Sequence, residues 1–134
     1  STAVGASRNV DGPTVLLSGD LSFLYDANAL WNAYLREDFR IIVIHNSGGG
    51  IFRILPGFRE KPDFATFFET VHHRSLGPLC EMHGLKYHKA EDADELTKQL
   101  ETFFEPSGAP ALLEIKTPRE RNDKILLDYF QFLS

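Results

Sequence analysis

The sequence has little cysteine, no excess of positive charge and no long apolar run. Its 134 residues contain a single cysteine, so no internal disulfide can form. Fourteen lysines and arginines stand against nineteen acidic residues, a formal net charge of −5, and this balance argues against a nucleic-acid-binding surface. No stretch reaches the length of a membrane span, and the first residues do not resemble a signal peptide. We therefore expect a soluble, cytoplasmic protein.

Two nucleotide-binding signatures are also missing. No Gly-x-Gly-x-x-Gly follows the first apolar run, and no Walker Gly-Lys-Ser/Thr occurs. A flavodoxin-like or receiver-like domain would need further acidic residues at the end of its first strand, and the sequence does not supply them. These absences count against a nucleotide-binding module and against flavodoxin-like or receiver-like domains.

The sequence does contain a regular alternation of strand and helix patterns. With 43% apolar and 25% charged residues, it has the composition of one globular domain with a core. Apolar runs that stop at small polar residues predict strands, and apolar spacings of three and four predict helices. The expected strands lie at 14–17, 41–44, 85–88 and 111–116, and the expected helices lie at 22–37, 75–83, 92–105 and from 119 or 122 to 133. This order predicts an α/β fold, a doubly wound, mostly parallel sheet with helices on both faces.

Two further segments carry predictions of their own. Residues 1–7 resemble the end of a helix that packs against a sheet, so we expect the chain to be a piece of a longer protein. Residues 58–74 have no clear period and form the kind of long loop that often serves as a lid or a contact surface. An equally valid interpretation is a covering loop anchored by its phenylalanines.

Oxygen donors follow the first two predicted strands. Asp20 comes directly after the first strand, and Asn46 follows the second. The carboxyl ends of parallel strands share one edge of a sheet, and a single helix and strand fit between these two residues. Mg²⁺ prefers hard oxygen ligands and leaves positions for phosphate and water. Asp20, Asn46 and the carbonyl of Gly48, which glycine's backbone freedom lets turn inward, therefore predict a Mg²⁺ site against a diphosphate.

The start of the helix after Asp20 is the predicted phosphate contact. Backbone N–H groups at Leu21 and Ser22 would meet the diphosphate, and the Ser22 side chain can cap the helix. The apolar face expected for this helix consists of Leu24, Ala27, Leu30, Trp31, Tyr34 and Leu35.

The same residues resemble the metal–diphosphate motif of thiamine-diphosphate enzymes, Gly-Asp-Gly with a later Asn-Asn. Gly19, Asp20, Asn46 and Gly48 match the motif, whereas His45 stands in place of the first asparagine. Segments 19–30, 46–52 and 85–88, with Leu55-Pro56, are similar to the MenD branch, the 2-succinyl-5-enolpyruvyl-6-hydroxy-3-cyclohexene-1-carboxylate synthases of menaquinone biosynthesis. That branch carries leucine where this chain has Leu21.

The resemblance implies that residues 1–134 are the C-terminal, diphosphate-binding domain of a longer, multi-domain transferase. It implies the cofactors thiamine diphosphate and Mg²⁺, with Mn²⁺ as a substitute, and metal ligands at Asp20, Asn46 and Gly48. The cofactor-binding residues that it implies are Gly19, Asp20, Leu21, Ser22, Asn46, Gly48, Ile51 and Phe52. Ile51, Phe52 and Leu55 would line the apolar wall near the thiazolium ring and the substrate.

The reaction implied by the resemblance has two parts. 2-Oxoglutarate loses CO₂, and the resulting succinyl-semialdehyde carbanion adds to isochorismate. The family's activating glutamate belongs to the pyrimidine-binding domain of a second subunit, so we expect a homo-oligomer, no catalytic residue in this chain and no turnover by the chain alone. Two alternatives stay open, the same domain of another thiamine-diphosphate-dependent decarboxylase or synthase, and a non-catalytic doubly wound binding module.

Overall fold

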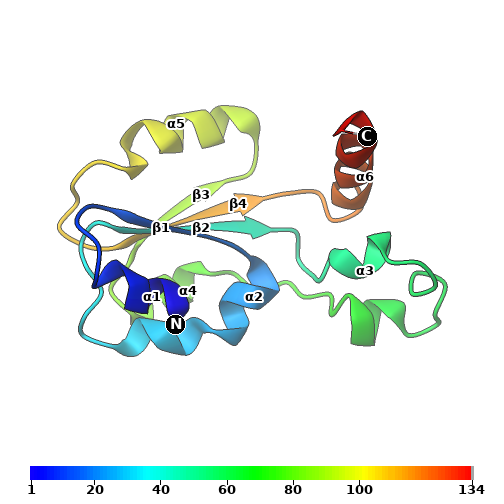
Figure 1. Cartoon of the computed structure of the whole chain (residues 1–134), viewed down its shortest axis with the longest axis horizontal. Helices are drawn as coiled ribbons and strands as arrows, with labels where there is room; N and C mark the ends of the chain where they lie inside the picture. Colours follow the sequence, from blue (N-terminus) through cyan, green and yellow to red (C-terminus); the bar gives the residue numbers. More distant parts are fainter. Residues whose placement is uncertain (134) are drawn as a thin grey trace. The chain divides into compact units, whose positions relative to one another are not determined.

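A computed structural model describes residues 1–133 of the chain. These residues form two compact units, one made of 1–45 and 75–116 and the other of 46–74 and the segment from Thr117 onward. The first unit contains the strands β1 (Thr14–Gly19), β2 (Phe39–His45), β3 (Lys86–Ala90) and β4 (Ala111–Lys116). They make one sheet in the order β1-β2-β4-β3, with every neighbouring pair parallel (Figure 1). The predicted parallel sheet is confirmed.

Helices cover both faces of this sheet, as expected for a doubly wound fold (Figure 1). One face carries α1 (Thr2–Ser7), α2 (Asp20–Tyr25) and α4 (Gly77–Met82), and the other carries α5 (Ala93–Phe103). Successive residues of the central strands alternate between the two cores: Leu112 packs with the first set of helices and Leu113 with α5. Both faces of the central strands are therefore buried, which explains their nearly continuous apolar sequence.

The helix predicted at 92–105 is α5, and both of its ends are satisfied by side chains. The Asp92 carboxylate accepts the N–H of Glu95 at 2.8 Å, the cap that its spacing predicts. At the other end the buried guanidinium of Arg40 donates to the carbonyls of Phe103 and Glu105, each at 2.7 Å. The apolar spacing of 92–105 predicts that Leu96, Leu100, Phe103 and Phe104 face inward. Leu96 and Phe103 do so, whereas Leu100 and Phe104 are exposed, at 39% and 52%, and this part of the prediction is wrong.

The crossover helix predicted at 22–37 is wrong in length. The helix α2 starts at Asp20 and stops at Tyr25, a 3₁₀ turn follows at Ala27–Trp31, and the chain is then irregular as far as β2. Asp26 lies at the break, between the end of α2 and the 3₁₀ turn, where its backbone angles (φ −111°, ψ 16°) are outside the helical range. Within the predicted apolar face Leu30 is buried, whereas Trp31 and Tyr34 are exposed.

The segment before β3 confirms a short helix, α4, with Leu76 and Cys80 in the core. Burial and the nearby charge of Glu114 raise the pKa of the Cys80 thiol to about 12. The thiol is therefore protonated at neutral pH and fills space in the core. The apolar spacing of 75–83 predicts that Leu76, Leu79, Cys80 and Met82 face inward, but Met82 is exposed.

The second unit consists of α3 (Ile51–Ile54), a π-helical turn at Phe64–Phe68 and α6 (Asn122–Leu133). Phe52, Phe58 and Phe68 pack against one another, with ring centroids 5.2 to 5.8 Å apart; Phe68 meets the other two rings edge to face, and Phe52 and Phe58 are tilted. The buried carboxylate of Glu69 accepts from Arg53 and, at 2.9 Å, from Arg119. Two phenylalanines of the segment 58–74, Phe58 and Phe68, thus anchor it as predicted. Phe67 is exposed and does not.

Across residues 1–133, no helix combines the length and the apolar character that crossing a membrane requires.

Candidate functional site

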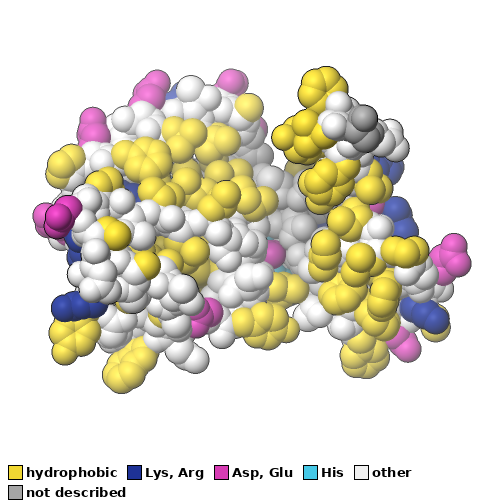
Figure 2. Space-filling view, in the orientation of Figure 1, with side chains coloured by type: hydrophobic (Ala, Val, Ile, Leu, Met, Phe, Trp, Pro, Cys, Tyr) yellow, Lys and Arg dark blue, Asp and Glu magenta, His cyan; other side chains and the backbone are white. Residues whose placement is uncertain are grey.

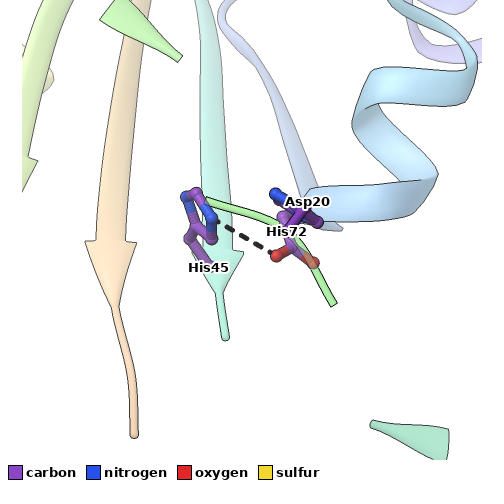
Figure 3. Close-up of side chains that lie close together, drawn as sticks. All are labelled: Asp20, His45 and His72. Atoms are coloured by element: carbon purple, nitrogen blue, oxygen red, sulfur yellow. Dashed lines mark ion pairs between the residues drawn. The ribbon is translucent and has the colours of Figure 1, made fainter. Parts of the chain in front are cut away.

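Asp20 lies at the carboxyl end of β1, beside the end of β2. Gly19 pairs with Ile44 across the two strands, and Asp20 is the first residue of α2. Its side chain is almost completely buried, at 2% exposure. One carboxylate oxygen, Oδ1, accepts the N–H of Leu21 at 2.9 Å, and Oδ2 lies 3.5 Å from Nε2 of His45 (Figure 3). The structure therefore places this carboxylate at the predicted edge of the sheet, with both oxygens held.

Two details of the predicted phosphate contact need correction. The helix begins at Asp20 and not at Ser22, and among the described residues no side chain caps it. Ser22 is exposed, and the N–H of Leu21 donates to the adjacent Asp20 carboxylate. The reason is positional: the N-cap of this helix is Gly19, so Ser22 lies inside the helix and its hydroxyl is not at the capping position.

Asn46 directly follows the last residue of β2 and opens a turn that includes three glycines. Its side-chain oxygen accepts the N–H of Gly48 at 3.3 Å, an Asx-type contact that shapes the turn. The carbonyl of Gly48 accepts the N–H of Gly50 at 3.1 Å.

Glycine is needed at position 48 for a different reason from the one expected. The left-handed backbone angle of the turn belongs to Ser47, with φ of 65°, and Gly48 has no such angle. A Cβ at Gly48 would instead lie 2.9 Å from the backbone oxygen of Glu69. The same oxygen accepts the N–H of Gly49 at 2.6 Å, so the turn is packed tightly against residue 69.

The apolar residues predicted as a wall lie in and just after α3. Ile51 and Leu55 are exposed, at 54% and 40%, while Phe52 is half-buried in its aromatic cluster. Their contact with a cofactor or a substrate stays a prediction.

A buried ionic group that the sequence reasoning missed adjoins Asp20. His45 and Glu114 are both completely buried, and Nδ1 of His45 lies 2.5 Å from Oε1 of Glu114. Burial alone would raise the pKa of Glu114, but donors from Tyr87, Lys116 and His45 outweigh it and hold the pKa below its ordinary value. The sequence does hold one indication of this group, because Glu114 lies inside the apolar run 111–116 and a charge in a buried strand needs a partner.

The predicted metal ligands have the donor types that a hard divalent cation takes. A carboxylate, an amide oxygen and a backbone carbonyl are the ligand types that Mg²⁺ takes, and the buried Asp20 carboxylate supplies the negative charge. The sequence brings Asp20 and Asn46 to the ends of two strands that pair in parallel. The chemistry of these side chains thus suits a metal-bound diphosphate.

Comparisons with known proteins agree with this chemistry. Residues 1–115 match the family described as thiamine pyrophosphate enzyme, C-terminal TPP binding domain. The 2-succinyl-5-enolpyruvyl-6-hydroxy-3-cyclohexene-1-carboxylate synthase of Christiangramia forsetii is 50% identical over 133 residues, which cover 99% of this chain and 23% of the relative. The same synthase of Flavobacterium johnsoniae is 51% identical over 134 residues, which cover 100% and 24%.

A solved structure has a similar fold. The thiamine diphosphate-dependent 4-hydroxybenzoylformate decarboxylase of Rhodococcus jostii RHA1 superposes with a TM-score of 0.69 at 27% identity, over 87% of this chain and 22% of that one. The chain spans about a quarter of the length of the curated relatives that it matches.

These findings confirm the resemblance seen in the motif around Asp20 and Asn46. Enzymes of this kind use thiamine diphosphate, and Mg²⁺ is their usual metal. The family match extends over most of the chain, from the first helix into the last strand. The chain therefore belongs to the thiamine pyrophosphate enzyme family, in which it corresponds to the C-terminal TPP-binding domain.

Proposed function

We propose that the chain is the diphosphate- and Mg²⁺-binding domain of a 2-succinyl-5-enolpyruvyl-6-hydroxy-3-cyclohexene-1-carboxylate synthase. This enzyme decarboxylates 2-oxoglutarate and joins the remaining four-carbon unit to isochorismate. The observation that carries the proposal is the identity of 50% and 51% to two such synthases over almost the whole chain. The activity belongs to the longer protein, of which this chain would form the C-terminal part.

In this proposal Asp20, Asn46 and the Gly48 carbonyl hold the metal, and Gly19 to Ser22 contact the diphosphate. The burial of Asp20 at the end of β1 supports its role, because a carboxylate with little access to water gains most from a bound cation. Thiamine diphosphate, when bound, would supply the electron sink for decarboxylation. The chain's own contribution is placement of the diphosphate and neutralisation of its charge.

The second unit supplies the proposed substrate side of the domain. Ile51, Phe52 and Leu55 would face the thiazolium ring and the substrate, and the exposure of Ile51 and Leu55 is consistent with a surface that another group covers. The expected homo-oligomer, the pyrimidine-binding domain of a second subunit and the cytoplasmic location remain predictions.

The metal site is tested by calorimetry on the full-length protein that contains this chain. Thiamine diphosphate should bind in the presence of Mg²⁺ or Mn²⁺ and lose most of its affinity when a chelator removes the metal. Asp20→Asn should weaken metal-dependent binding more than tenfold, because it removes the only charged ligand proposed. Asp94→Asn, at an exposed acidic position in α5, is the matched control and should bind as wild type does. Equal cofactor binding by the Asp20 variant would contradict the site.

The substrate assignment is tested by turnover. The full-length protein should consume 2-oxoglutarate only slowly without isochorismate and rapidly with it, whereas benzoylformate should not react. Rapid decarboxylation of benzoylformate would favour the alternative, a decarboxylase like the Rhodococcus enzyme. The chain of 134 residues alone should show no turnover, because the activating glutamate is expected from another domain. Cofactor binding without any turnover by the full-length protein would favour a non-catalytic binding module.

A further inference from the structure

The strand β4 carries a glutamate in the interior of the first unit. Glu114 is completely buried and accepts hydrogen bonds from the Tyr87 hydroxyl at 2.6 Å and the Leu76 N–H at 3.3 Å. The Lys116 ammonium group lies 2.9 Å from its Oε1. Burying a charge carries a large desolvation penalty unless polar partners offset it. So many donors around one carboxylate keep it ionised inside an otherwise apolar core.

Its remaining partner is His45, at the end of the neighbouring strand β2. Val43, which pairs with Glu114 across β2 and β4, lies two positions before His45, so the three side chains share one face of the sheet. An ionised carboxylate can only accept, so a hydrogen bond between the two groups requires the proton on Nδ1 of His45. The Lys116 ammonium group also lies 2.8 Å from Nδ1 and 3.2 Å from Nε2. The contact with Glu114 orients the imidazole ring so that Nε2 is its other polar atom.

The second ring nitrogen of His45, Nε2, lies next to the carboxylate of Asp20. The distance from Nε2 to Oδ2 of Asp20 is 3.5 Å, and the close-up in Figure 3 shows the ring and the carboxylate facing each other. Because Leu21 donates to Oδ1, the carboxylate is restrained at both oxygens. A continuous row of buried polar groups therefore runs across three neighbouring strands, from Glu114 on β4 through His45 on β2 to Asp20 after β1.

We propose that Glu114 is a positioning residue that acts through His45 to set the orientation of the Asp20 carboxylate. The inference rests on the proposed function, in which Asp20 binds the metal. Groups that orient a metal ligand without touching the metal typically change metal affinity by about 10- to 100-fold when they are removed. His45 and Glu114 have the position and the burial for this role, and neither needs to contact the cofactor.

The experiment uses the full-length protein and three variants. Glu114→Gln keeps the shape of the side chain and removes its charge. His45→Asn keeps an N–H for Glu114 and removes the nitrogen that faces Asp20. Tyr87→Phe is the matched control, because it removes a donor to Oε2 of Glu114 and leaves the contact between Oε1 and His45 intact. Mn²⁺ affinity in the presence of thiamine diphosphate is read from the electron paramagnetic resonance signal of free Mn²⁺.

We expect Glu114→Gln and His45→Asn each to weaken Mn²⁺ binding by about 10- to 100-fold. For both variants, kcat at saturating Mg²⁺ should stay close to the wild-type value. Tyr87→Phe should lower the unfolding temperature and leave Mn²⁺ affinity unchanged. In the double variant Glu114→Gln should add no further loss to that of His45→Asn, because both would act along one path.

Several results would overturn the inference. It fails if Glu114→Gln binds Mn²⁺ as tightly as wild type, or if the two losses multiply in the double variant. It also fails if Tyr87→Phe loses as much affinity, since a general loss of stability would then explain every variant. If Glu114→Gln does not fold, unchanged Mn²⁺ affinity in His45→Asn is sufficient to reject it. Failure of the proposed function would look different: the wild-type protein itself would show no metal-dependent cofactor binding. The calorimetry with Asp20→Asn detects that result independently of the Glu114 and His45 variants.

Discussion

Gly48 shows how a single missing side chain can matter. The backbone oxygen of Glu69 lies where a Cβ at position 48 would need to be, at 2.9 Å, and the same oxygen bonds the N–H of Gly49. Any side chain at this position must push the turn after β2 away from residue 69. The turn contains Asn46 and Gly48, so its geometry and the proposed metal site depend on each other.

We expect Gly48→Ala to destabilise the protein by about 1–3 kcal/mol, the usual cost of forcing extra atoms into a packed site. The change should also weaken Mg²⁺-dependent cofactor binding, because the turn must move. Thermal unfolding and calorimetry measure the two effects. Gly5→Ala is the control: among the described residues nothing lies within 4 Å of a Cβ there, and alanine favours the helix α1. If Gly48→Ala is as stable as wild type, the backbone at Glu69 can move to accommodate the added Cβ, and the expectation is wrong.

At the scale of elements, α5 and the crossover after β1 form a useful contrast. The sequence predicts α5 within two residues at each end, because Asp92 and Glu95 provide a local cap and the apolar face is clear. The crossover is broken at Asp26, where the backbone leaves helical geometry. Aspartate competes for backbone hydrogen bonds and is a poor helix former, an effect that the apolar periodicity of 22–37 does not show.

The carboxyl end of α5 depends on an arginine from the sheet. Arg40 extends from β2 and donates to the carbonyls of Phe103 and Glu105 in a buried setting. We expect Arg40→Met to cost about 3 kcal/mol or more, because it leaves these carbonyls without their charged donor. Denaturant unfolding measures the loss, and hydrogen exchange should show faster opening in the last turn of α5.

Lys98→Met is the matched control for Arg40, since it removes a positive charge from the exposed side of the same helix. It should change stability by less than about 0.5 kcal/mol, as is usual for surface positions. Equal losses in the two variants would mean that net charge, and not the hydrogen bonds of Arg40, stabilises the helix.

At the scale of the whole molecule, many apolar side chains remain uncovered in both units. In the first unit, Val15 and Leu17 of β1 and Trp31 are exposed. In the second, the helix α6 exposes Ile125, Leu126, Leu127, Tyr129, Phe130, Phe132 and Leu133, and Figure 2 shows apolar side chains gathered over it. Contiguous apolar surface of this kind usually marks a contact with another part of a protein. The chain's share of about a quarter of its relatives' length is consistent with such contacts.

We therefore expect the 134-residue chain, prepared alone, to self-associate as its concentration rises. Phe132→Glu should reduce this association, because the side chain is 84% exposed and its replacement removes apolar surface at little cost to the fold. Thr97→Glu makes the same change in charge on the polar side of α5 and should have little effect. Light scattering coupled to size-exclusion chromatography measures both. A chain that stays monomeric at all concentrations would contradict the expectation.

The sequence by itself determined the order of strands and helices, the parallel sheet and the position of Asp20 after β1. These features follow from local patterns, because apolar runs, caps and glycine-rich turns act over a few residues. The family motif could be recognised in the sequence because its residues directly follow two predicted strands.

Only the tertiary structure decided which distant groups meet. His45 and Glu114 are 69 positions apart, and their contact exists because β2 and β4 are neighbours in a sheet whose strand order does not follow the chain. The steric role of Gly48 and the exposure of Trp31, Leu100 and Phe104 likewise depend on what packs against each residue. Periodicity assigns a side chain to a face of a helix or strand, but only the folded chain determines whether anything covers that face.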